Sequence, residues 1–139
     1  MAGENADWRD EIKQGAAARG LNISFTSAVT DHDASDAAGD HLSAQDNQFW
    51  RDHQSAKVNA IRTKPLIEQA DLVVVRFGDK YKQWNAAFDA GYCAALGKPY
   101  VTLHAADIVH PLKEVDAAAM AWATTTEQVV ETLAYVTQV

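Results

Sequence analysis

The sequence has a single cysteine and an excess of acidic side chains. One cysteine in 139 residues, Cys93, leaves no partner for an intrachain disulfide and excludes a cysteine-rich metal site. Twelve Lys and Arg against 19 Asp and Glu give a formal net charge of −7. Because binding a phosphate backbone requires a basic face, a nucleic-acid polymer is not expected as a partner. The low cysteine content favours a reducing compartment, and we expect a cytoplasmic protein.

Long apolar runs and recognisable ligand loops are also missing. No stretch approaches the roughly 20 apolar residues of a membrane span, and the start of the chain does not resemble a secretory leader, so no membrane partner is expected. Neither a glycine-rich phosphate loop nor zinc-ligand spacing is found, and the acids and histidines of residues 31–41 do not have the spacing of a calcium loop. We therefore expect no metal and no cofactor.

The remaining composition is that of an ordinary globular protein. Hydrophobic residues make up 47% of the chain and charged residues 22%. A chain of this length can bury a substantial core but has little room for a second one. We predict a single domain spanning residues 1–139.

Apolar spacing predicts alternating helices and strands. A helix from about residue 7 to 20 has Trp8, Ile12 and Ala16 on its buried face, and residues 21–29 alternate like a strand. An Asp- and Ser-rich loop follows, and residues 48–69 are helical in pattern. Strands are predicted at 72–77, 99–104 and 118–124, before a closing helix at 125–139 that Thr125 or Thr126 caps. This order predicts a flavodoxin-like layered α/β fold with a mostly parallel sheet, in which the usual N-terminal strand is missing.

The stretch QWNAAFDAGYCAALGKPYVTLH places one acid, Asp89, in an otherwise apolar helix. Asn85 is a candidate N-cap, and Gly97 and Pro99 mark the end, so the helix is expected from residue 86 to 96. Asp89 then lies near the carboxyl ends of the strands, where ligands bind in open α/β sheets. It shares a stripe with Asn85 and Tyr92, whereas the neighbouring Gly91 would let the helix approach the sheet. Stabilisation by the helix dipole is the alternative explanation for Asp89.

Three segments, MAGENADWRDEI, FWRDHQSAKVNAIRTKPLIEQADLVVVRFGDKYKQWNAAFDAGYCAALGKP and HPLKEV, resemble the YtoQ family, which is grouped with the nucleoside 2-deoxyribosyltransferase-like proteins. In the better-characterised deoxyribosyltransferases, the Glu of a Glu-x-Gly motif attacks the anomeric carbon of a 2-deoxynucleoside. Asp89 in DAG occupies that position. The resemblance thus implies an enzyme that cleaves or exchanges the N-glycosidic bond of a (deoxy)nucleoside or nucleotide through a carboxylate nucleophile, with this small molecule as its partner.

Other residues are candidates for supporting roles in such a site. Gly3 and Glu4 resemble the end of the family's first strand, and either Glu4 or Asp79 is a candidate proton donor. A frayed terminus is the alternative for Glu4, and a turn position beside Gly78 is the alternative for Asp79. Flat rings stack on nucleobases, and arginine binds phosphate or carboxylate. The candidate substrate-binding residues are therefore Gly3, Arg51, Arg62, Tyr81, Trp84 and Asn85, for which loop packing and solvated helix surface are the alternatives.

Two other functions fit the same sequence. The first is a non-catalytic module that binds a nucleotide or nucleotide-sugar in the same crevice. The second is an assembly role, because related folds associate through their helices, and a homo-oligomer is expected in any case. Turnover that depends on Asp89 distinguishes the enzyme from both.

Overall fold

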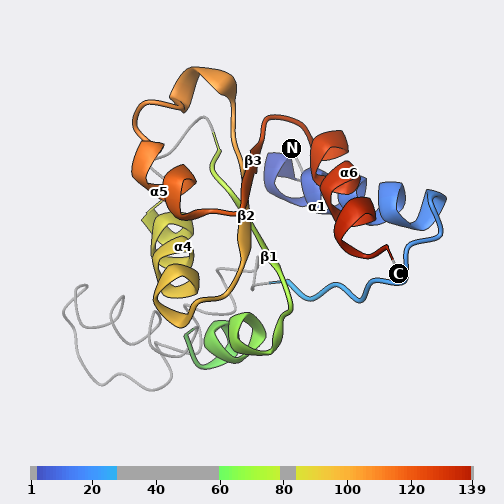
Figure 1. Cartoon of the computed structure of the whole chain (residues 1–139), viewed down its shortest axis with the longest axis horizontal. Coiled ribbons are helices and arrows are strands. Elements are labelled where there is room, and N and C mark those ends of the chain that lie inside the picture. Colours follow the sequence, from blue (N-terminus) through green and yellow to red (C-terminus); the bar gives the residue numbers. More distant parts are fainter. Residues whose placement is uncertain (1–2, 28–59, 79–83, 139) are drawn as a thin grey trace. The chain divides into compact units, whose positions relative to one another are not determined.

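The computed structural model describes residues 3–27, 60–78 and 84–138 (Figure 1). The chain divides into two compact units, one formed by Met1–Phe25 with Asp71–Val139 and the other by Thr26–Ala70. In the second unit, residues 60–69 are helical, as the sequence predicts. The Asp- and Ser-rich loop and most of the predicted 48–69 helix lie outside the described residues. The assignment of residues 1–139 to a single domain stays a prediction.

The first unit contains a parallel three-stranded sheet. Its strands are β1 (Val73–Arg76), β2 (Tyr100–Leu103) and β3 (Ala121–Ala123), in the order β1-β2-β3. Both pairs are parallel, with Val75 opposite Thr102 and Thr102 opposite Trp122. All four residues of β2 are buried, as expected for a central strand that is covered on both faces. The three predicted strands after residue 70 and the layered α/β fold class are confirmed.

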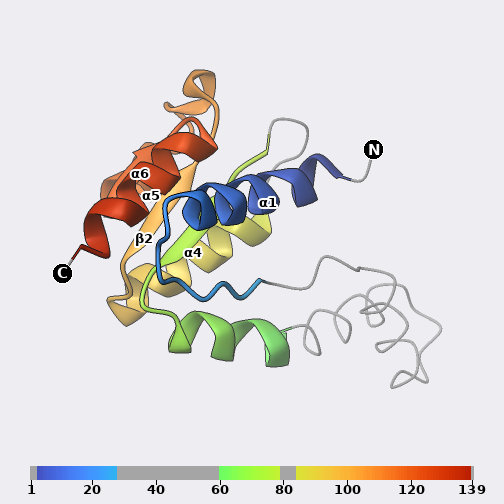
Figure 2. The same ribbon diagram turned by 90° about the vertical axis from the view of Figure 1, so that its right-hand side faces the viewer.

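Helices cover both faces of this sheet (Figures 1 and 2). Helices α4 (Trp84–Leu96) and α5 (Lys113–Ala118) lie on one side, and α1 (Gly3–Ala18) and α6 (Thr126–Val136) lie side by side on the other. A short 3₁₀ turn, η1 (Ala106–Ile108), follows β2. Side chains alternate along β2, so Thr102 faces α5 and Leu103 faces α1 and α6.

The main core lies between the sheet and the α1–α6 pair. Its buried members are Ile12, Leu103, Ala123, Val129, Val130 and Leu133, and Trp8 packs against them. At the rim, Arg19 forms an ion pair with Glu131 at 2.6 Å, and the Thr126 hydroxyl donates to Glu11 at 2.7 Å. The predicted buried face of α1 is confirmed, since Ile12 and Ala16 are buried and Trp8 is half-buried. The helix begins at Gly3 rather than near Asp7, because Glu4 and Ala6 are good helix formers and nothing in between breaks the helix.

The predicted end of α4 and start of α6 are confirmed. Gly97 has a φ of +70°, the Lys98 N–H donates to Cys93 O at 2.8 Å and the Gly97 N–H to Ala94 O at 3.2 Å, which is the Schellman pattern. Thr125 caps α6 by accepting from the Gln128 N–H at 3.2 Å.

Three local predictions are wrong. Helix α4 begins at Trp84, so Asn85 lies inside the first turn and is not the N-cap. Gly91 is exposed, and a Cβ there would meet no atom within 4 Å, so it does not bring α4 close to the sheet. Residues 21–27 form no strand. Their alternation has another cause: Leu21 and Ile23 pack against the core, while Asn22 between them is exposed.

A pair of Gly→Ala substitutions tests the close approach of α1 to α6. A Cβ on Gly15 would lie 2.8 Å from Cγ2 of the buried Val130, whose β-branched side chain rotates little, whereas Gly91 is open. Both substitutions gain similar helix propensity, so the difference between them isolates the clash. We expect Gly15→Ala to be less stable than Gly91→Ala by about 1–3 kcal/mol in urea unfolding. Equal stability would show that the helices separate at no cost.

Candidate functional site

Asp89 lies in the second turn of α4, the helix that follows β1 and packs on β1 and β2. This part of a crossover helix is close to the carboxyl ends of parallel strands, where ligands bind in open α/β sheets. Asp89 is half-buried and precedes the buried Ala90, and the buried Cys93 lies one turn further along. Cys93, the single cysteine, is thus a small core residue. The Asp89 carboxylate therefore lies between the helix surface and the packed interior.

Burial controls the electrostatics of Asp89. Desolvation raises the pKa of its carboxyl group above the ordinary value of 3.8. Among the described residues, no hydrogen bond or ion pair to this side chain offsets the cost. The charge of Asp89 in turn contributes, after burial itself, to raising the pKa of the Cys93 thiol. An acid whose main interaction was with the helix dipole would have a lowered pKa, so the dipole alone does not account for Asp89.

The structure places only part of the predicted site around Asp89. Trp84 and Asn85 occupy the first turn of α4 and are exposed, with 71% of Trp84 accessible. Gly3 and Glu4 lie in the first turn of α1. Arg62 is an exposed residue of the 60–69 helix, in the other unit. The remaining candidates lie outside the described residues: Arg51, Asp79 and Tyr81.

A buried polar cluster at the carboxyl end of β2 was not predicted. The Asp116 carboxylate of α5 accepts from the Thr102 hydroxyl through Oδ1 at 2.7 Å and lies 2.7 Å from His104 Nε2 through Oδ2. His104 Nδ1 lies 2.8 Å from the carbonyl oxygen of Ala105. The imidazole is buried and stacks on Trp122, with ring centroids 5.5 Å apart and an interplanar angle of 4°.

This cluster fixes α5 and the start of the following loop to the sheet. Both ring nitrogens of His104 lie within hydrogen-bond distance of an oxygen atom, one on the Asp116 side chain and one on the Ala105 backbone. The Tyr100 hydroxyl adds a third link by donating to Val115 O at 2.6 Å. The sequence gives one indication of this polar cluster: Tyr100, Thr102 and His104 alternate along the chain, so they leave the same face of the sheet. Asp116 is 12 and 14 positions away from two of its partners, and no local spacing marks it.

The same described ranges contain no candidate metal site and no membrane-spanning helix. There, no three His, Cys, Asp or Glu side chains come together in a way that would hold a metal ion. None of the helices in those ranges has the length and apolar character needed to cross a bilayer. The Asp- and His-rich stretch at 31–41, considered above as a metal ligand set, lies outside them.

Substitution of Asp116 tests the buried cluster. Asp116→Ala leaves the His104 ring and the Thr102 hydroxyl without their partner, and we expect a loss of about 2–4 kcal/mol in unfolding free energy. Asp116→Asn should lose less than half of this, because its amide still accepts from Thr102 and donates to a neutral imidazole. Asp107→Ala, at an exposed acid of η1, is the control for removing a charge. Equal stability of the Asp116→Ala and Asp107→Ala proteins in urea would refute the role of the cluster.

Comparison with known proteins supports the resemblance seen in the sequence. A protein-family model described as "Nucleoside 2-deoxyribosyltransferase YtoQ" matches residues 1–137. The chain is also 38% identical over 137 residues to a protein of Bacillus subtilis (strain 168) named "Uncharacterized protein YtoQ". That match covers 97% of this chain and 93% of the relative. The chain therefore belongs to the family described as nucleoside 2-deoxyribosyltransferase YtoQ.

Proposed function

We propose that this protein cleaves or exchanges the N-glycosidic bond of a (deoxy)nucleoside or nucleotide, with Asp89 as the carboxylate nucleophile. Membership of a nucleoside 2-deoxyribosyltransferase-like family supports the reaction class. One observation supports the role of Asp89 as the nucleophile. It is a half-buried carboxylate with a raised pKa, and it lies in the first half of α4. An ionised carboxylate with few hydrogen bonds keeps its electron density available for attack.

The reaction proceeds in two displacements. A carboxylate oxygen of Asp89 forms a bond to the anomeric carbon, while the bond to the base nitrogen breaks and the base leaves with the electron pair. An acid supplies a proton to the departing base, and Glu4 and Asp79 are the proposed donors. Water or a second base then attacks the same carbon, gives up a proton to the donor acid that was deprotonated in the first step, and releases Asp89 as a carboxylate. Attack by water gives hydrolysis, and attack by a second base gives base exchange.

The remaining candidate residues have binding roles in this proposal. Trp84, exposed at the start of α4, and Tyr81 provide flat surfaces for a nucleobase. Asn85 lies one helical turn before Asp89, at the spacing where side chains share a face, and is suited to hydrogen bonding with the sugar. Gly3 is a further proposed substrate contact, whereas Arg51 and Arg62 belong to the other unit and stay sequence predictions. Exposed Phe88 on α4 also favours the proposed homo-oligomer, since exposed apolar surface is commonly covered by another chain.

Base release tests the proposed function directly. We expect the protein to liberate free base from a member of a panel of deoxynucleosides and deoxynucleotides, separated by chromatography. Asp89→Asn should lower the rate at least about 100-fold, because the amide is a poor nucleophile. Asp107→Asn, which removes one exposed acid from the same unit, should leave the rate unchanged. A panel left intact at high protein concentration would contradict the enzymatic proposal.

One observation favours the alternative of a binding module. Burial is the cause of the raised pKa of Asp89, and no second carboxylate in the described part of the chain contributes to it. Glycosyl transfer requires a second acid beside the nucleophile, and the described side chains near Asp89 do not provide one. Thermal stabilisation by a nucleotide, with no base released from it, would identify the module.

The raised pKa of Asp89 predicts opposite effects on stability and on turnover. The folded chain holds the Asp89 proton more tightly than the unfolded chain, so protonation of Asp89 stabilises the folded state. This stabilisation is present below the pKa of Asp89 in the unfolded chain, and it is lost as the pH rises through the pKa in the folded chain. At pH 7 we expect Asp89→Asn to raise the Tm by a few degrees, and this gain should disappear as the pH falls toward 3.8. Turnover should fall on the acid side at a pH above 3.8. Scanning fluorimetry across pH measures the first effect, and a lower Tm for Asp89→Asn at pH 7 would refute it.

A further inference from the structure

Trp122, in the middle of β3, combines an accessible ring with a rigid support. Its indole stacks on the imidazole of the buried His104, with ring centroids 5.5 Å apart and an interplanar angle of 4°. His104 is itself held by contacts of 2.7 Å to the Asp116 carboxylate and 2.8 Å to the Ala105 carbonyl oxygen. The stack leaves 48% of Trp122 accessible. Little side-chain entropy is therefore lost when a ligand packs on this ring.

A groove lies beside Trp122 where β3 meets α6. Its volume is about 430 Å³, and its walls are formed by Trp122, Ala123, Thr124, Gln128, Glu131 and Thr132. This volume falls within the range of about 300–1,000 Å³ that is typical of small-molecule sites. The groove also lies at the carboxyl end of a parallel strand, where ligands bind in open α/β sheets. It is separate from Asp89, because α4 covers the other face of the sheet.

The Gln128 side chain provides hydrogen-bond donors to the groove. Its Oε1 atom accepts from the Thr124 N–H at 2.7 Å and from the Thr124 hydroxyl at 3.2 Å. Because a backbone N–H can only donate, this contact fixes which end of the amide faces Thr124. The NH₂ group at the other end has no protein acceptor in the described part of the chain, so it is available to a ligand.

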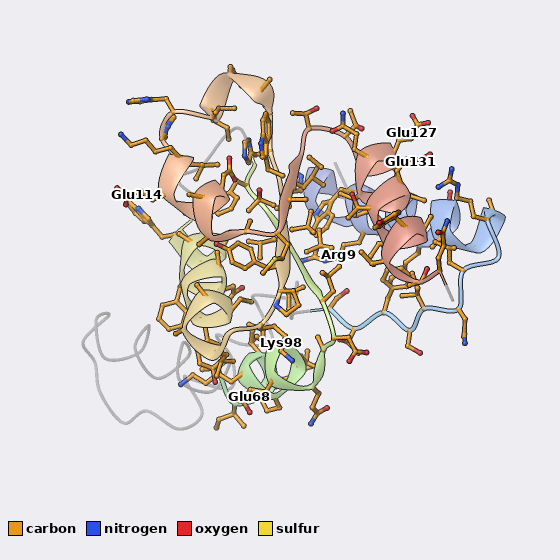
Figure 3. The ribbon with its side chains drawn as sticks, in the orientation of Figure 1. Arg9, Glu68, Lys98, Glu114, Glu127 and Glu131 are labelled. Atoms are coloured by element: carbon orange, nitrogen blue, oxygen red, sulfur yellow. The ribbon has the colours of Figure 1, made fainter. Side chains whose placement is uncertain are left out.

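The other polar groups of the groove favour an uncharged ligand. The Thr132 hydroxyl donates to Gln128 O at 3.0 Å, which leaves its oxygen able to accept from a ligand. Glu131, one turn after Glu127 on α6 (Figure 3), is already paired with Arg19 at 2.6 Å. None of the described residues that line the groove is basic, so a phosphate or carboxylate has no cation to bind there.

We propose that this groove binds a neutral heteroaromatic ring of the nucleobase class. The ring stacks on Trp122, because flat rings pack on the faces of bases. The Gln128 NH₂ group donates to a carbonyl oxygen or ring nitrogen of the base, and the Thr132 hydroxyl accepts from a ring N–H. The site uses neither Asp89 nor the cleavage of an N-glycosidic bond, so it goes beyond the proposed function.

Fluorine NMR of the protein labelled with 5-fluorotryptophan tests the groove. The chain has four tryptophans, and the resonance that Trp122→Phe removes belongs to Trp122. We expect free hypoxanthine or uracil to shift this resonance, with a midpoint near or below about 1 mM. Neither base has an N-glycosidic bond, so turnover does not interfere. The sugar 2-deoxyribose, which has no flat ring, should leave the resonance in place.

Gln128→Glu is the decisive variant, because the carboxylate keeps an acceptor for the Thr124 N–H but has no donor for the base. It should raise the midpoint of the Trp122 shift about tenfold or more while the Tm changes by no more than a few degrees. Gln14→Glu makes the same charge change at an exposed position of α1 and should leave the midpoint unchanged.

The Trp122 resonance separates this site from the proposed active site. A resonance that stays in place with both bases, or a shift with the same midpoint in Gln128→Glu, overturns the groove as a base site even if Asp89-dependent base release is found. A Trp122 shift that depends on Gln128, in a protein that releases no base from any nucleoside, supports the groove and refutes only the proposed enzymatic function.

Discussion

Strand β2 has no face toward solvent, and the first unit is organised around this constraint. Its odd and even side chains enter two different environments, one apolar and one polar. Leu103 joins the aliphatic core under α1 and α6, whereas Thr102 and the following His104 meet Asp116 on the α5 side. The apolar side contributes nondirectional burial, and the polar side contributes directional bonds that specify where α5 sits. Helix α4, which carries Asp89, packs on this strand and on its neighbour β1.

The sequence predicts those parts of the fold that depend on local chemistry. Gly97 and Pro99 mark the end of α4 because a left-handed residue and a ring without an N–H act within one turn, and Thr125 caps α6 in the same way. Ile12 and Ala16 are four residues apart, which is helical spacing. The buried face of α1 can therefore be predicted from the sequence without knowing which element covers it. The three parallel strands follow from apolar runs that alternate with helical segments.

Predictions that depend on distant partners fail or remain incomplete. Residues 21–27 alternate as a strand does, but alternation reports only that one side is covered, and here a core covers Leu21 and Ile23 without a hydrogen-bonded ladder. The bonds of Asp116 to Thr102 and His104 form only after β2 and α5 are packed, so spacing along the chain does not reveal them. Asp89 was found through its resemblance to a family motif and its place on the crossover helix. Its half-burial, which decides the direction of its pKa shift, required coordinates.

The contact between α1 and α6 also has a consequence for biosynthesis. The Thr126–Glu11 bond joins residues 115 positions apart, and the apolar stripe of α1 is covered by Val129, Val130 and Leu133 of α6. During translation, α1 leaves the ribosome long before α6 exists, so Ile12 and Ala16 lack their final cover until nearly all of this sequence has been made. Contacts of such long range also slow the search for the native state. The nascent chain is consequently exposed to premature association through α1, and chaperone binding to this helix would shield it until α6 emerges.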